Sequence, residues 1–188
     1  STHAYICNTS KSVFKDASTR QALSKALDRN KAASLVTFAK PATGLIPSPV
    51  YDKAVGDSFR ANGGDLLSAS AQSASGSGSF TLTIRDNAYE KTLAEYCKGV
   101  WEGMGFKVTI KALDAKDYKK AYENQDYDMI AVDYQCLTTD AFSALSVFAP
   151  AFSGNGIDIQ NDNYDAVPYV PGYDNAAYNE LIEKAFAE

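Results

Sequence analysis

Residues 80–134 read FTLTIRDNAYEKTLAEYCKGVWEGMGFKVTIKALDAKDYKKAYENQDYDMIAVDY, and this stretch decides the fold class. Its beginning and its middle each alternate apolar with polar side chains, which is the period of a half-buried strand. Between these two strands the pattern predicts a helix from about Ala88, and Gly105 suits the left-handed residue that ends a helix. The apolar residues that define the three elements are Phe80, Leu82, Ile84, Leu93, Tyr96, Cys97, Val100, Trp101, Met104, Phe106, Val108 and Ile110.

The same stretch continues with a second helix and a third strand. Asp114 is the predicted N-cap of a helix in which Tyr118 and Tyr122 share one face, and residues 127–134 form the strand. Strands and helices in strict alternation predict parallel βαβ units with right-handed crossovers. The predicted fold class is therefore α/β, with helices on both faces of a mixed, mainly parallel sheet.

The flanking segments add elements to this sheet. Asp16 is a predicted N-cap of one helix, and Asn30 is the predicted cap of another that runs through Phe38. Prolines make residues 41–49 an extended connection, because proline lacks a backbone donor and disfavours a helix before it. The remaining predicted elements are a strand over 5–7, a helix over 140–148 with Asp140 as its cap, and a helix over 178–187.

Residues 68–79 read SASAQSASGSGS and offer almost nothing to bury. This composition predicts a flexible surface loop. An interdomain hinge is the alternative, but one sheet needs the segments on both sides of the loop. We therefore expect residues 1–188 to form a single domain.

Composition restricts the class of protein. The 188 residues are 45% hydrophobic and 22% charged, as in an ordinary globular domain, and the net charge is −5. A nucleic-acid binder needs an excess of basic residues, so no nucleic-acid partner is expected. No apolar run approaches the roughly 20 residues that a membrane-spanning helix requires.

Three cysteines (Cys7, Cys97 and Cys136) and one histidine (His3) restrict the chemistry further. The cysteine spacings fit neither a zinc site nor a redox pair, and spacing alone leaves their pairing open. His3 lies where chain ends fray, which disfavours a catalytic histidine. No metal or other cofactor is expected. Because the chain has no initiator methionine and ends inside a helical pattern, we expect a domain excised from a longer protein.

Three classes of function remain. The carboxylates Asp126, Asp128 and Asp133 could serve an acidic hydrolase, but no oxyanion hole or phosphate loop accompanies them. An interaction module is the second class. A ligand-binding α/β domain fits better, because ligands bind at the carboxyl ends of strands and Asp133-Tyr134-Gln135 ends the last parallel strand. A calcium loop is also conceivable at Asp158, Asn161, Asp162, Asn163 and Asp165, although the spacing lacks the glycine and glutamate of an EF-hand.

Several segments resemble, in order, the extracytoplasmic solute-binding proteins of peptide and nickel ABC importers. Arg20 and Asp28-Arg29 within them are expected to serve helix ends. The segments are NTSKSVFKD (8–16), TRQAL (19–23), ALDR (26–29), TGLIP (43–47), GMGFKV (103–108), YDM (127–129) and YNELIEKA (178–185).

The resemblance implies the second lobe of a two-lobed receptor with the type II periplasmic-binding-protein fold. Such a receptor closes on its ligand by hinge bending and catalyses no reaction. It further implies a peptide or other small-molecule ligand, membrane permease subunits as partners, and a monomer. The expected location is extracytoplasmic, either free or lipid-anchored through a preceding segment. A lone lobe offers half of a cleft and is expected to bind weakly or not at all.

In the family that the chain resembles, peptide-binding members carry the pattern Gly-Trp-x-Ala-Asp-Tyr-x-Asp-Pro at this strand end. The first Asp of that pattern holds the α-ammonium of the ligand. Two alignments are open. In the alignment without a gap, Tyr134 aligns with the Trp of the pattern, Leu137 aligns with its first Asp, and Asp140-Ala141 aligns with its Asp-Pro. With a four-residue gap, Asp133-Tyr134 becomes the Asp-Tyr. We prefer the ungapped alignment, which leaves Asp133 to act as the anion from an earlier position on the strand. The predicted ligand-binding residues are Asp133, Tyr134, Gln135, Leu137 and Asp140.

Overall fold

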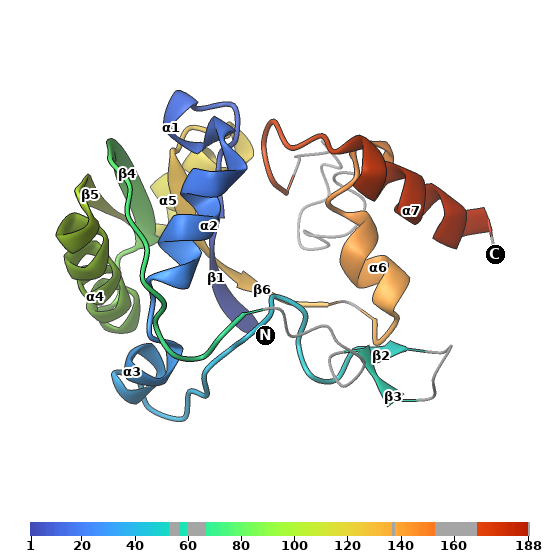
Figure 1. Ribbon diagram of the computed structural model, residues 1–188, viewed down its shortest axis with the longest axis horizontal. Coiled ribbons are helices and arrows are strands. Elements are labelled where there is room, and N and C mark those ends of the chain that lie inside the picture. Colours follow the sequence, from blue (N-terminus) through green and yellow to red (C-terminus); the bar gives the residue numbers. More distant parts are fainter. Residues whose placement is uncertain (53–56, 60–66, 137, 153–168, 188) are drawn as a thin grey trace. The chain divides into compact units, whose positions relative to one another are not determined.

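The structure is a computed structural model that describes residues 1–52, 57–59, 67–136, 138–152 and 169–187 (Figure 1). Helices and strands alternate strictly from residue 78 to residue 146. In chain order the elements are β1 (Thr2–Cys7), α1 (Ser12–Lys15), α2 (Ala17–Lys25), α3 (Arg29–Ser34), β2 (Tyr51–Asp52), β3 (Asp57–Ser58), β4 (Gly78–Arg85), α4 (Ala88–Met104), β5 (Phe106–Leu113), α5 (Ala115–Glu123), β6 (Met129–Tyr134), α6 (Ala141–Ser146), the 3-10 helix η2 (Pro150–Phe152) and α7 (Ala176–Ala187).

The chain divides into two compact units. One, the sheet unit, contains Ala4–Thr43 and Leu67–Val132. The other, the tail unit, contains Ser1–His3, Gly44–Leu66 and Asp133–Glu188. Strands β1 and β6 each begin in one unit and end in the other. The last residues of β6 are therefore part of the tail unit.

The main sheet has the order β1-β6-β4-β5. Strand β4 runs parallel to β5 along its whole length and parallel to β6 around Leu82 and Met129. Strand β1 runs antiparallel to β6, because His3 lies opposite Asp133 whereas Asn8 lies opposite Asp128. The prediction of an α/β fold with a mixed, mainly parallel sheet is confirmed.

Helices cover both faces of this sheet. On one face, the Trp101 indole N–H of α4 donates to the Leu23 carbonyl oxygen of α2 at 3.0 Å, so these two helices pack together over the same strands. On the other face, the Tyr118 hydroxyl of α5 donates to the Ala131 carbonyl oxygen of β6. Figure 1 shows α2 and α5 on opposite sides of the strands. The buried core between α1, α2, α4 and the sheet consists of Phe14, Leu23, Phe80, Leu82, Ile84, Ala94, Cys97, Trp101, Phe106, Val108, Met129 and Ala131.

Most of the predicted helix ends are confirmed. The Asp16 carboxylate accepts from the Ser18 backbone N–H at 2.9 Å, and the Asp114 carboxylate accepts from the Asp117 N–H at 2.8 Å. Gly105 ends α4 with a φ of 118°, in the left-handed region. A side chain at this position would also place its Cβ 2.7 Å from the Gly76 carbonyl oxygen. Both the backbone conformation and the close approach of the Gly76 oxygen therefore require glycine at this position.

The prediction for α3 was wrong at both ends. Its cap is Asp28, whose carboxylate accepts from the Lys31 N–H at 3.0 Å, and the predicted cap Asn30 lies inside the helix. The helix ends at Ser34, well before Phe38. The backbone of Phe38 has a φ of 63°, which no α-helix contains.

Asn8 and Arg20, near the start of the chain, have structural roles. Asn8 is buried, and its side-chain amide donates to the Gln125 and Tyr127 carbonyl oxygens at 3.3 and 3.1 Å. The Arg20 guanidinium donates to the Phe14 carbonyl oxygen at 2.6 Å, at the end of α1. The expectation that Arg20 serves a helix end is therefore confirmed.

Residues 71–77 contain neither helix nor strand, and β4 begins at Gly78. Residues 69–72, at the start of this loop, are nevertheless hydrogen-bonded to the backbone where α2 is followed by α3. The Gln72 N–H donates to the Lys25 carbonyl oxygen at 2.8 Å, and the Arg29 N–H donates to the Ala69 carbonyl oxygen at 2.7 Å. The flexibility of residues 68–79 stays a prediction.

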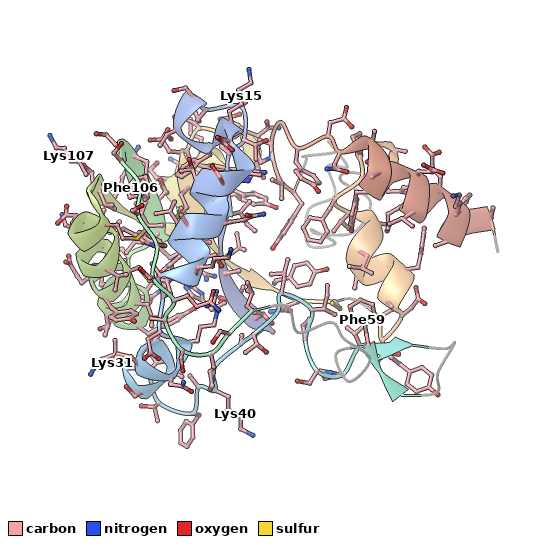
Figure 2. All side chains as sticks on the ribbon, in the orientation of Figure 1. Lys15, Lys31, Lys40, Phe59, Phe106 and Lys107 are labelled. Carbon is pink, nitrogen blue, oxygen red and sulfur yellow. The ribbon has the colours of Figure 1, made fainter. Side chains whose placement is uncertain are left out.

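Exposed lysines of the sheet unit point away from one another. Figure 2 shows Lys15, Lys31, Lys40 and Lys107 extending outward from different places on this unit. All four residues are exposed to solvent. These four charges do not gather into the basic stripe that binds a phosphate backbone.

Candidate functional site

Asp133 occupies the second-to-last position of β6, at the carboxyl end of the parallel strands. Its side chain is 29% exposed, and its Oδ1 lies 2.9 Å from Nδ1 of His3, whose side chain is 19% exposed. A carboxylate in this position can attract a cationic group while its own orientation is held by a hydrogen bond.

His3 was expected to fray, and that expectation was wrong. It belongs to β1, and the pairing of β1 with β6 places it against Asp133. The sequence carries one signal for this residue, since it is the single histidine of the chain. Its partner lies 130 residues away, so only the strand register reveals the contact.

Tyr134 follows Asp133 and is buried within the tail unit. Its hydroxyl donates to the Ala144 carbonyl oxygen of α6, and its ring contacts Phe148 and Tyr169 at centroid distances of 6.2 and 5.5 Å. Burial is the main cause that raises the pKa of Tyr134, so the phenol remains a protonated donor. These contacts attach the end of β6 to α6.

The other three predicted residues are dispersed. Gln135 is exposed directly after β6, and Leu137 lies outside the described residues. Asp140 caps α6, where its carboxylate accepts from the Ser143 N–H at 2.9 Å and from the Ser143 hydroxyl at 3.1 Å. The structure thus places Asp133, Tyr134 and Gln135 in succession at one strand end. Asp140 is instead the N-cap of α6.

The other carboxylates of the hydrolase hypothesis have separate surroundings. Asp128 accepts from the Thr81 N–H at 2.9 Å and lies 3.8 Å from the Lys11 ammonium, and Asp126 is exposed in a turn. The five residues of the conceivable calcium loop lie outside the described residues. Among the residues that are described, no cluster of three or more His, Cys, Asp or Glu side chains could hold a metal ion.

The three cysteines are free thiols. Burial raises the pKa of the Cys7 and Cys97 thiols to about 12. Both therefore remain protonated near neutral pH, and a protonated thiol is a poor nucleophile.

A small cavity of about 220 Å³ lies within the tail unit between η2 and α7. Its polar lining comes from Asp174, Asn179 and Glu183. Ligand pockets usually measure about 300–1,000 Å³, so this cavity is too small to enclose a peptide.

The sequence matches the family described as bacterial extracellular solute-binding proteins, family 5 middle, over residues 1–157. The comparison with curated proteins finds no match. None of the described helices combines the length and the apolar composition that crossing a bilayer requires.

Solved structures show the same fold. A periplasmic oligopeptide-binding protein from Borrelia burgdorferi has a TM-score of 0.68 at 18% identity, over 98% of this chain and 36% of that protein. A peptide-binding protein of a peptide ABC transporter has a TM-score of 0.75 at 19% identity, over 98% of this chain and 83% of that one. Haemophilus influenzae OppA, in complex with RPPGFSPFR, has a TM-score of 0.63 at 15% identity, over 100% of this chain and 37% of that one.

At these identities the structural likeness shows the fold, and the chain spans 36% of the Borrelia burgdorferi protein's length. The family match is a separate finding, and it extends over most of the 188 residues. It confirms the resemblance that the sequence motifs indicate. The chain belongs to the bacterial extracellular solute-binding proteins of family 5.

Proposed function

We propose that this chain is the second lobe of an extracytoplasmic receptor that captures peptides and delivers them to an ABC permease. The family match and the likeness to peptide-binding proteins support this proposal. In this account the receptor binds its ligand without covalent chemistry, closes by hinge bending, and presents the closed form at the membrane. Nucleotide hydrolysis belongs to a partner subunit, and this chain catalyses no reaction.

The observation that carries the proposal is the carboxylate of Asp133. It is partly exposed at the carboxyl end of β6, and a hydrogen bond from His3 holds it. A fixed carboxylate pairs well with the α-ammonium of a peptide, because a charge-assisted hydrogen bond is about twice as strong as a neutral one. Every peptide with a free amino terminus carries that group, so this contact accepts many sequences.

The neighbouring residues have supporting roles in this account. Gln135 is exposed and offers an amide that can bond a peptide backbone. Tyr134 holds the strand end through its hydrogen bond to the Ala144 carbonyl oxygen. Asp140 caps α6, and Leu137 is proposed as an apolar ligand contact.

A single substitution tests the proposal in the full-length protein that contains this chain. The probe is an equimolar library of tripeptides to pentapeptides with free amino termini, and retained peptide is measured after gel filtration. Asp133→Asn keeps the shape and removes the charge, so it should weaken retention by more than about tenfold. Asp126→Asn removes the same charge from an exposed turn and should leave retention unchanged. Unchanged retention by Asp133→Asn would exclude Asp133 from the site.

A further inference from the structure

We infer that residues 31–41 form a membrane-contact site, at which Phe38 enters the headgroup region of an anionic bilayer and Lys31 and Lys40 pair with lipid phosphates. These residues, the Phe38 tip, comprise the last turns of α3 and the segment that follows it. The inference goes beyond the proposed function and does not depend on peptide capture.

Phe38 is the most exposed large apolar side chain among the described residues. It is 101% exposed, and the next in order, Phe186, is 68% exposed. The backbone of Phe38 has a φ of 63°, a conformation that bulky residues rarely adopt. Water is an unfavourable environment for a phenyl ring, and strained backbone conformations gather where proteins contact other molecules. Phe38 is therefore displayed for contact with something outside the sheet unit.

The charge of the tip is opposite in sign to the charge of the whole chain. Residues 29–43 contain Arg29, Lys31 and Lys40 and neither aspartate nor glutamate, whereas the net charge of the chain is −5. Arg29 is occupied within the fold, where its guanidinium donates to the Ser68 carbonyl oxygen at 3.2 Å. Lys31 and Lys40 are exposed, and their ammonium groups form no ion pair with the described residues. Two positive charges are thus available to an anionic partner.

The two lysines belong to the same end of the sheet unit as α3. Figure 2 shows Lys31 and Lys40 extending from this end, whereas Lys15 extends from the opposite end. The preceding carboxylate, Asp28, is engaged as the cap of α3, where it accepts from the Lys31 backbone N–H at 3.0 Å. The Phe38 tip therefore combines one displayed ring with two ammonium groups on one end of the unit.

A bilayer surface matches this combination. Aromatic rings are favoured at the level of the headgroups, while lysines keep their ammonium groups in water beside the phosphates. Anionic lipids attract each lysine near the surface, whereas most of this acidic chain would be repelled. A groove on a protein would call for several apolar side chains, but Ser34 and Thr37 beside Phe38 are polar and exposed. One ring and two lysines give a weak, reversible contact.

The test uses the full-length protein that contains this chain, in which Phe38→Trp adds a fluorophore that prefers the same depth. The vesicles are phosphatidylcholine with roughly 30% phosphatidylglycerol at about 5 mM total lipid, because the contact is weak. Their acyl chains carry bromine near the headgroup end. Relative to the same vesicles without bromine, the emission that Phe38→Trp adds over wild type should fall by at least about one quarter. The fall should be at least about threefold smaller with brominated phosphatidylcholine alone.

Matched variants show whether the tip itself makes the contact. Lys31→Gln combined with Lys40→Gln should reduce the quenching of Phe38→Trp at least about threefold. Lys15→Gln combined with Lys107→Gln removes the same charge elsewhere on the unit and should leave the quenching unchanged. Lys15→Trp places the fluorophore at the opposite end and should not be quenched.

Three results would overturn the inference: no quenching of Phe38→Trp, equal quenching of Lys15→Trp, or an equal loss of quenching from the two pairs of lysine variants. Quenching that requires a permease in the vesicle would also overturn it, and would assign the Phe38 tip to a protein partner. Peptide retention is measured separately, and the tip variants should leave it unchanged. A protein that contacts lipid but retains no peptide would overturn the proposed function and leave this inference standing.

Discussion

The Tyr134 hydroxyl donates a hydrogen bond to the Ala144 carbonyl oxygen, which joins the end of β6 to α6 inside the tail unit. Both residues are buried, at 4% and 2% exposure. Tyr134 could either contact the ligand or hold the end of the strand in place. Its environment favours the second role.

Tyr134→Phe removes the hydroxyl and leaves the Ala144 carbonyl oxygen without this donor. We expect the free energy of unfolding to fall by about 1–2 kcal/mol, because a buried acceptor is left unsatisfied. Urea unfolding followed by circular dichroism measures the change. Peptide retention by the folded variant should stay within about twofold of wild type, since the account gives the hydroxyl no ligand contact. A tenfold loss of retention with unchanged stability would instead make Tyr134 a ligand-binding residue.

Two glycines near the end of α4 provide a matched pair. Gly105→Ala should lower the free energy of unfolding by at least about 1–3 kcal/mol, because its φ is 118° and the new Cβ would meet the Gly76 carbonyl oxygen. Gly103→Ala lies inside the helix with nothing within 4 Å of its Cβ. That change should be neutral or stabilise the protein by up to about 1 kcal/mol. Urea unfolding of both variants checks the pair, and equal effects would contradict the geometry at Gly105.

Stability should also decline in mild alkali. Burial raises the pKa of Cys7 and Cys97 to about 12 in the folded protein, whereas an unfolded cysteine loses its proton near about pH 8.5. Above that pH the unfolded chain binds fewer protons than the folded one, so the free energy of unfolding falls as the pH rises. The contribution is complete below about pH 8.5 and is lost progressively towards pH 12.

Urea unfolding under reducing conditions at about pH 7.5, 8.5 and 9.5 measures this decline, because these values lie on either side of the pKa of an unfolded cysteine. We expect roughly 1 kcal/mol per thiol between pH 8.5 and 9.5. The double variant Cys7→Ala, Cys97→Ala should be less stable at neutral pH and should decline less over this interval. An equally steep decline in the double variant would show that other groups cause it.

Local patterns predict much of this fold. The alternation at Phe80, Leu82 and Ile84 and the caps at Asp16 and Asp114 act over a few residues, so the sequence displays them directly. The α3 cap was harder to predict, because Asp28 and Asn30 are both good capping residues two positions apart. Only the packed structure selects Asp28.

The site depends on relationships that the sequence does not display. The position of Asp133 at a strand end follows from the βαβ order, but its contact with His3 depends on pairing between the two most distant strands in the sequence. Strand alternation indicates that Asp133 and Tyr134 point to opposite faces, yet it does not indicate which face α6 closes. Burial of Tyr134 is a tertiary property of Ala144, Phe148 and Tyr169.

We propose that the full-length protein containing this chain is a peptide receptor. Native mass spectrometry of that protein, purified gently from its own host, tests this most directly. We expect bound masses that fragment as short peptides with free amino termini, and we expect them to be lost in Asp133→Asn but kept in Asp126→Asn. A spectrum without bound peptide, in which a second protein is retained instead, would contradict the account and favour an interaction domain.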